Sequence, residues 1–234
     1  MSVTLGIDTS STDLGIGIFR DAAATASYSR YIGNSHAEHI APVIRMMLTG
    51  SGIAPEEVDR ISVAVGPGSF TGLRIGIAFV KGFCIAHPVP VLPVSSLFIL
   101  AHAVRHHQGR VVAAIDARNN DVFWAIFSPG NGLIRRRTDD SVTPSGNFTA
   151  ALKPGDVVVT DTVGYRKSSV FSALPQFCTE IRVENHPLQR GLLCAEYGVA
   201  SVSDQALWRN HPDIHPNYLR HSAPEERMAA KGKV

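Results

Sequence analysis

Val3–Phe19, VTLGIDTSSTDLGIGIF, and Val111–Phe127, VVAAIDARNNDVFWAIF, decide the fold because they are two copies of one unit. Laid side by side without gaps, the copies share a valine, an isoleucine, two aspartates and the closing Ile-Phe. In each copy an apolar strand ends at an aspartate, Asp8 or Asp116, crosses a short polar turn and returns as a second strand. The sequence therefore predicts two hairpins with an aspartate at each tip, in a chain that contains one architecture twice.

Around the first hairpin, the pattern predicts a strand near 24–31 and an amphipathic helix over 35–49. Ser35 and Glu38 have the spacing of a capping box at the start of that helix. The second half has weaker periodicity, and we expect a strand near 157–161 and a helix near 187–199. We therefore expect an N-terminal lobe over residues 1–105, a C-terminal lobe over 106–224 and a flexible tail over 225–234.

Val63–Lys81, VAVGPGSFTGLRIGIAFVK, is predicted to form a strand, a glycine-rich turn and a helix over about 71–86. Such a junction suggests a phosphate site, but no lysine directly precedes Ser69 or Thr71 as a Walker A loop requires. The glycines are therefore interpreted as a sharp turn. The helix is apolar on nearly all sides, and Gly72, Gly76 and further small residues would let another helix approach closely, either in the core or at a subunit interface.

Composition restricts the class of protein. The chain has 234 residues and a formal net charge of only +2, so its charge predicts no general affinity for nucleic acid or acidic membranes. The three cysteines are far apart, without a CxxC pair, which is typical of reduced thiols. The chain starts directly with a strand, and the longest apolar stretch is interrupted by Lys81. We expect a cytoplasmic protein that does not enter a membrane.

Two sets of residues are candidates for chemistry. Paired hairpins with acidic tips hold nucleotides in the fold of actin, sugar kinases and heat-shock ATPases, so a degenerate nucleotide cleft is expected at Asp8, Thr9, Ser10, Ser11 and Asp116. The alternative is that both aspartates only cap turns. His36, Glu38 and His39 could place two ligands on one metal ion, but a third ligand and the HExxH spacing are missing. We therefore expect no metal site, and no serine or cysteine is in the context of a catalytic nucleophile.

The motifs LGIDTSSTDLGIGIF, VAVGPGSFTGLRIG and PNYLR, the last at Pro216–Arg220, together resemble the TsaB (YeaZ) family over the whole chain. The resemblance implies an α/β protein of the actin-like ATPase (ribonuclease H-like) fold, with two similar subdomains whose mixed sheets are flanked by helices. It also implies a non-catalytic subunit that forms a heterodimer with its catalytic paralogue TsaD and works with the ATPase TsaE. Their reaction transfers threonylcarbamoyl to N6 of adenosine 37 in tRNAs that read ANN codons.

In that family the two helices of the first lobe make the dimer contact. Carried to this sequence, the contact falls on helices 35–49 and 71–86, at Ile40, Val43, Ile44, Met47, Leu73, Ile77, Val80, Lys81 and Cys84. The resemblance further implies tRNA contact through the complex, a possible homodimer without TsaD, and no cofactor beyond a weak or degenerate ATP/ADP cleft. Two alternatives stay open: an ATP-dependent phosphotransferase or ATPase that uses Asp8, and a metallo-glycoprotease-like peptidase that uses His36 and His39.

Overall fold

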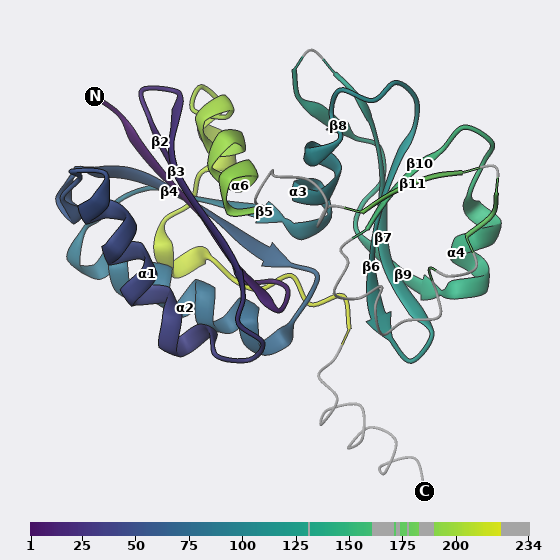
Figure 1. Cartoon of the computed structure of the whole chain (residues 1–234), viewed down its shortest axis with the longest axis horizontal. Helices are drawn as coiled ribbons and strands as arrows, with labels where there is room; N and C mark the ends of the chain where they lie inside the picture. The colour runs from purple at the N-terminus through teal and green to yellow at the C-terminus, as the bar shows by residue number, and fades with distance from the viewer. Residues whose placement is uncertain (131, 161–170, 172–173, 177, 183–189, 221–234) are drawn as a thin grey trace, which may run out of the picture.

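Two mixed β-sheets lie side by side in the computed structural model, which describes residues 1–130, 132–160, 171, 174–176, 178–182 and 190–220 (Figure 1). The first sheet has the strand order β3-β2-β1-β4-β5. Its strands are β1 (Val3–Asp8), β2 (Asp13–Arg20), β3 (Ala23–Tyr31), β4 (Val58–Gly66) and β5 (Val91–Ser95). The first three strands are antiparallel, and β4 and β5 run parallel to β1.

The second sheet repeats this topology. Its order is β11-β10-β6-β7-β8, and β9 also pairs with β7. The strands are β6 (Val111–Arg118), β7 (Asp121–Pro129), β8 (Ile134–Arg136), β9 (Ser141–Pro144), β10 (Val157–Thr160) and β11 (Thr179–Arg182). As in the first sheet, a hairpin (β6–β7) is extended on one side by an antiparallel strand and on the other by two parallel strands. The duplication predicted from the two sequence copies is confirmed.

The two faces of the first sheet carry different side chains because neighbouring residues of a strand point to opposite sides. Leu5 pairs with Ile18 and Ile7 with Ile16, whereas Gly6 between them pairs with a glycine. The large side chains pack against α1 (His36–Gly50) and α2 (Phe70–Ala86), and the glycine face lies against α6 (Arg190–Ala200). Helices α1 and α2 therefore cover one face of the first sheet and α6 covers the other (Figure 1).

Glycine is required under α6 because the helix backbone lies almost on the strands. A Cβ added at Gly6 would lie 2.3 Å from the carbonyl oxygen of Gly191, and one added at Gly17 would lie 2.4 Å from Cα of Leu192. Real Cβ atoms do not approach other heavy atoms this closely, so a side chain at either position would push the helix away. The glycines of the first sequence copy thus position a helix from the opposite end of the chain.

The second sheet is covered by α3 (Ser96–Ala103) on one face and α4 (Ser145–Ala151) on the other. Helix α3 follows the last strand of the first sheet, and α6 comes after the second sheet in the chain, so each helix packs on the sheet that the other half of the chain forms. The two helices also contact each other between the sheets. Short 3-10 turns occur at Pro55–Glu57, Gln205–Leu207 and His211–Asp213.

Most predicted elements are present with shifted ends. The helix expected over 35–49 is α1, but Ser35 makes no side-chain capping bond, so the predicted capping box with Glu38 is wrong; only the carbonyl of Ser35 accepts the N–H of Glu38, at 3.1 Å. Of the helix expected over 187–199, residues 187–189 lie outside the described residues, as do 221–224 and the predicted tail at 225–234. In the described part of the chain, no helix has the length and apolar character needed to cross a bilayer.

Candidate functional site

The turn after β1 holds Asp8 with both carboxylate oxygens engaged. Oδ1 accepts the backbone N–H of Ser10 at 2.8 Å and its hydroxyl at 2.6 Å. Oδ2 accepts Nε–H of Arg190, the first residue of α6, at 2.8 Å, and Nη2 of the same arginine donates to the Ser10 hydroxyl at 2.6 Å. The Asp8 and Arg190 side chains are only 2% and 11% exposed, so this is a nearly buried ion pair.

The glycine-rich turn between β4 and α2 packs on the Asp8 turn. A Cβ at Gly68 would lie 2.3 Å from the carbonyl oxygen of Ser10, and one at Gly72 would lie 2.1 Å from that of Thr9. The N–H of Ser69 donates to the Ser10 carbonyl at 2.7 Å, and the Ser69 hydroxyl caps α2 by accepting the N–H of Gly72 at 3.2 Å. These N–H groups are therefore used inside the protein, and the segment turns the chain from β4 into α2, as the sequence predicts.

The corresponding turn of the second sheet differs from the first. Asp116 is half-buried, and its Oδ1 accepts the N–H of Arg118 at 2.7 Å. Arg118 and the two residues after it all have positive φ, at 63°, 53° and 65°. Arg220 donates to two backbone carbonyls of the hairpin, at 3.2 and 3.4 Å, and pairs with Asp121 at 3.2 Å. Each predicted nucleotide-binding turn is thus contacted by an arginine from the C-terminal part of the chain.

Residues Arg209–Arg220, here called the strap, connect the two sheets. The strap starts at an isolated β-bridge to Val91 on β5, and the Lys81 ammonium of α2 donates to one of its carbonyls at 3.2 Å. Farther along, the N–H of Asn217 donates to the carbonyl of β4 residue 65 at 2.7 Å, and Arg220 reaches the β6–β7 hairpin. The strap therefore joins α2 and the first sheet to the second sheet.

Asp140, in the loop between β8 and β9, connects three parts of the molecule. Its Oδ2 accepts the hydroxyl of Ser95 at 2.7 Å and the side-chain amide of Asn217 at 3.4 Å, and its Oδ1 pairs with Arg136. These partners come from the end of β5, from the strap and from β8. The Asp140 side chain is only 6% exposed, so the carboxylate is part of the junction between the two sheets.

The predicted nucleotide residues lie in two separate turns. Asp8, Thr9 and Ser10 are buried, and Ser11 is half-buried with its hydroxyl accepting the N–H of Asp13 at 3.1 Å. Because Arg190 already pairs with Asp8, a metal ion at this carboxylate would have to share it with the arginine or displace the arginine.

The histidines predicted as weak metal candidates do not form a site with other ligands. His36 is buried, its Nε2 lies 3.5 Å from the carbonyl oxygen of Asp13, and burial lowers its pKa below the usual histidine value. His39 is half-buried and Glu38 is exposed on α1. Among the residues that the structure describes, no three histidine, cysteine or acidic side chains are placed to share an ion.

The predicted partner residues are mostly core residues. All but Lys81 are buried, and seven of them lie in the cluster between the first sheet and its two helices: Ile40, Val43, Ile44, Met47, Ile77, Val80 and Cys84. Leu73 is also buried, at 1% exposure. Their side chains cannot contact another protein while the lobe is folded, so the expectation that they form the contact surface is corrected. The sequence pattern identified the buried stripe of each helix and not the stripe that faces outward.

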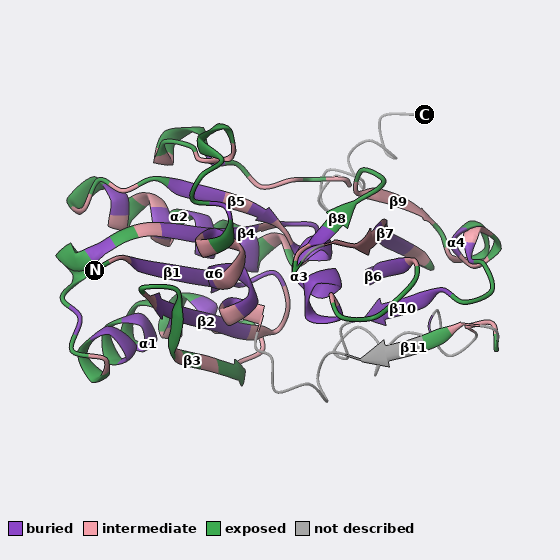
Figure 2. Ribbon diagram, turned by 90° about the horizontal axis from the view of Figure 1, so that it is seen from above, coloured by how far each residue is buried: buried purple, intermediate pink, exposed green. Residues whose placement is uncertain are grey.

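The outward faces of α1 and α2 carry a second apolar surface. Ile85 is 74% exposed on α2, and Met46 is 57% exposed on α1. Ala78 and Gly82 are exposed, the adjacent Phe79 and Phe83 are half-buried, and a Cβ added at Gly82 would meet no atom within 4 Å. Figure 2 shows buried colour along the central strands of the first sheet and both buried and exposed colour on α1. We call Met46, Ala78, Phe79, Gly82 and Ile85 the outer helix face.

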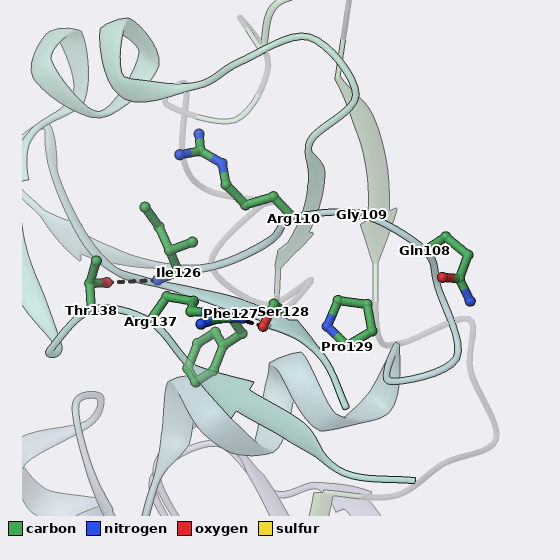
Figure 3. A pocket seen from close by; sticks show the side chains of 9 residues that line it. All are labelled: Gln108, Gly109, Arg110, Ile126, Phe127, Ser128, Pro129, Arg137 and Thr138. Carbon is green, nitrogen blue, oxygen red and sulfur yellow. Dashed lines mark hydrogen bonds between the residues drawn. The ribbon is translucent and has the colours of Figure 1, made fainter. Parts of the chain in front are cut away.

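A hollow of about 590 Å³ lies on the second lobe, away from every predicted site residue (Figure 3). Ile126 and Pro129 of β7 give it apolar walls, and Arg137 is held beside it by donating Nε–H to the Ser128 hydroxyl at 2.7 Å. Arg110 lies at its border, where its guanidinium forms a two-bond pair with Asp156 at 2.6 and 2.8 Å, and this pairing raises the pKa of Arg110. The hollow shares no residue with the Asp8 turn or the outer helix face.

Three contact residues could not be found from local patterns. Arg190, Arg220 and Asp140 act across 182, 103 and 45 residues of sequence, respectively. Arg220 lies in the PNYLR motif, so the resemblance marked the segment without showing its contacts. No local pattern marks Arg190 or Asp140, because an arginine or aspartate in a weakly periodic region is typical of an ordinary surface residue.

The family model described as "TsaD: tRNA N6-adenosine threonylcarbamoyltransferase" matches residues 29–164, more than half of the chain. The tRNA threonylcarbamoyladenosine biosynthesis protein TsaB of Bacillus subtilis is 34% identical over 65% of this chain and 66% of that protein. The protein of the same name in Escherichia coli is 31% identical over 64% of this chain and 62% of its own length. The matches thus span slightly less than two thirds of these relatives.

Solved structures agree over almost the whole chain. YeaZ from Pseudomonas aeruginosa is 28% identical with a TM-score of 0.79, and the match covers 94% of this chain and 100% of that one. The activator of 2-hydroxyisocaproyl-CoA dehydratase from Clostridium difficile has a TM-score of 0.51 at 12% identity, over 92% and 99% of the two chains, which shows the fold alone. The predicted actin-like ATPase fold with two mixed sheets is confirmed.

Proposed function

The chain belongs to the TsaB (YeaZ) family of tRNA threonylcarbamoyladenosine biosynthesis proteins, and we propose that it is a non-catalytic subunit that binds TsaD through the outer helix face. In this proposal the heterodimer, together with the ATPase TsaE, modifies N6 of adenosine 37 in tRNAs that read ANN codons. The complex works in the cytoplasm, where the free thiols of Cys84, Cys178 and Cys194 stay reduced.

The state of Asp8 supports a role without catalysis of its own. An acid that binds a nucleotide-bound metal ion must offer its oxygens to that ion. Here Oδ1 accepts from Ser10, and Oδ2 accepts from Arg190 in a nearly buried ion pair that magnesium would have to share or displace. The ATPase alternative therefore gains no support from the turn that motivated it, and the peptidase alternative gains none from His36, whose ring is buried against backbone.

The outer helix face carries the partner proposal. Ile85 and Met46 are large apolar side chains exposed on two helices that contact each other, and exposed apolar patches mark contact surfaces. Gly82 and Ala78 have little or no side chain, so a helix of the partner can approach the α2 backbone closely there. TsaD fits this face because it is expected to be a paralogue of this chain. A paralogue would have an equivalent pair of helices that could pack against α1 and α2.

Gly82→Glu tests the surface without disturbing the core. The new side chain points into open space, so folding should be unaffected, while a charge enters the proposed apolar contact. We expect capture of purified TsaD to weaken at least about tenfold, measured by calorimetry or co-elution. Gly146→Glu on α4 is the matched control, because Gly146 is also an exposed helical glycine with no atom within 4 Å of an added Cβ.

Reconstitution tests the function itself. TsaD, TsaE, ATP, a threonylcarbamoyl donor and tRNA should modify adenosine 37 only when this chain is added, and the Gly82→Glu variant should support less modification than the Gly146→Glu variant. Equal modification without the chain would refute the scaffold role. Equal capture of TsaD by both variants would place the contact on another face.

A further inference from the structure

We propose that single-stranded RNA binds where the strap meets the β6–β7 hairpin, on a surface formed by Phe70, Arg74, Arg118, Tyr218 and Arg220, here called the strap surface. The inference rests on the proposed function, because a subunit of a tRNA-modifying complex works close to RNA. It adds a direct contact between this chain and RNA at the start of α2, where Arg74 lies one helical turn before Ala78 of the outer helix face that would hold TsaD.

The first half of the strap surface is an exposed stack of aromatic rings and an arginine. The Phe70 and Tyr218 rings stack with centroids 4.8 Å apart, and the Arg74 guanidinium lies 3.8 Å from the Phe70 centroid. Nε–H of Arg74 donates to the Tyr218 hydroxyl at 2.7 Å, which fixes the guanidinium beside both rings. Tyr218 is still 42% exposed despite these contacts, so part of its ring is open to solvent. Fixed aromatic and guanidinium planes of this kind are what unpaired bases stack on.

The second half is the tip of the β6–β7 hairpin. Arg118, Asn119 and Asn120 are exposed and all have φ between 53° and 65°, the left-handed region that side chains disfavour. Asn119 and Asn120 form the two-residue loop between Arg118 and Asp121, where a hairpin turn favours positive φ and asparagine tolerates it, so Arg118 is the residue whose type does not favour its φ. The tip presents the Arg118 guanidinium and the Asn119 amide, which are groups that bind phosphate oxygens and base edges, whereas the amide oxygen of Asn120 accepts the Ser145 hydroxyl at 2.9 Å.

The strap makes the two halves one surface. Tyr218 and Arg220 are two residues apart, and the first contacts the stack while the second contacts the hairpin. The acids nearby are engaged, Asp121 by Arg220 and Asp116 by the N–H of Arg118. Among the described residues, neither Arg74 nor the Arg118 side chain has a carboxylate partner, so both cations remain for phosphates.

A single strand suits this arrangement better than a duplex. The rings offer faces for stacking, and a base in a duplex already has both faces covered by its neighbours. A loop of RNA has unstacked bases and a flexible backbone, so one base can lie on the Tyr218 ring while an adjacent phosphate reaches Arg118. The net charge of +2 is too small to hold RNA non-specifically, which makes a local contact of this kind necessary.

The test measures binding of a fluorescently labelled RNA stem–loop, and of a blunt RNA duplex, to the full chain alone and in complex with TsaD. We expect Tyr218→Ala to weaken stem–loop binding about fivefold or more through lost stacking. Arg118→Ala should weaken it about threefold to tenfold and reduce the dependence of log affinity on log salt by about 0.7. Tyr218→Phe keeps the ring, so it should bind within about twofold of the wild type.

Two variants serve as controls. Tyr31→Ala removes an exposed aromatic ring and Arg45→Ala an exposed arginine, both far in sequence from the strap surface, and neither should change binding. The inference is overturned if the strap variants bind like these controls both alone and with TsaD, if Tyr218→Phe loses as much affinity as Tyr218→Ala, or if the duplex binds as tightly as the stem–loop. If the wild-type chain does not capture TsaD at all, the proposed function is refuted instead.

Discussion

At the scale of single residues, the two copies of the hairpin have diverged in how their aspartates are used. Asp8 is buried and paired with Arg190, whereas Asp116 is half-buried and accepts one N–H of its own turn. The sequence predicts both aspartates at equivalent places, and the sheets confirm the places. It could not predict the difference, because the partner of Asp8 is 182 residues away in a weakly periodic region.

Asp8→Asn should therefore be much more damaging than Asp116→Asn. An asparagine amide at position 8 can still accept from Ser10, but it removes the carboxylate that pairs with the nearly buried Arg190 guanidinium, which costs about 3 kcal/mol of the free energy of unfolding. At position 116 the amide oxygen can replace the carboxylate, so the change should stay within about 0.5 kcal/mol. Urea unfolding of the two variants measures this difference. Similar losses for both would show that Asp8 does not depend on Arg190.

At the scale of elements, helix α2 shows why the predicted contact residues were the wrong ones. Its sequence is apolar on nearly every side, so periodicity indicated that the helix is covered and could not say which side faces the sheet. The structure separates the two: Ile77 and Val80 are buried in the lobe, and Ile85 is exposed. The small residues divide in the same way, since Gly72 and Gly76 touch the Asp8 turn and Gly82 touches nothing.

Two glycine-to-alanine substitutions in this one helix should have opposite effects. At Gly82 an alanine has open space and improves helix propensity, so the free energy of unfolding should rise by about 1 kcal/mol. At Gly72 the added Cβ would lie 2.1 Å from the Thr9 carbonyl oxygen, a backbone atom that cannot swing away, so the free energy of unfolding should fall by about 1–3 kcal/mol. Thermal and urea unfolding give both values, and a change of the same sign at both sites would contradict the packing described.

At the scale of the whole molecule, the sequence shows the duplication but does not show the exchange of helices, in which α3 and α6 each pack on the sheet formed by the other half of the chain. The pairing of Val3–Phe19 with Val111–Phe127 predicts two similar sheets, and both are present with equivalent topology. Nothing local to Arg190–Ala200 indicates that this helix leaves the second sheet and packs on the first. Only Gly6, Gly15 and Gly17 hint at it, because three glycines on one face of buried strands leave room that another backbone fills.

This exchange predicts that the expected N-terminal lobe does not fold by itself. A fragment of residues 1–105 keeps all five strands of the first sheet and both outer helices but lacks α6, so the glycine face of β1 and β2 would be open to water. It would also lack Ile214 of the strap, which is buried against the same core. We expect this fragment to show no cooperative thermal unfolding by circular dichroism and to regain it when residues 106–234 are co-expressed, since the second fragment supplies α6. If the fragment unfolds cooperatively by itself, the first sheet is stable without α6, and this prediction is wrong.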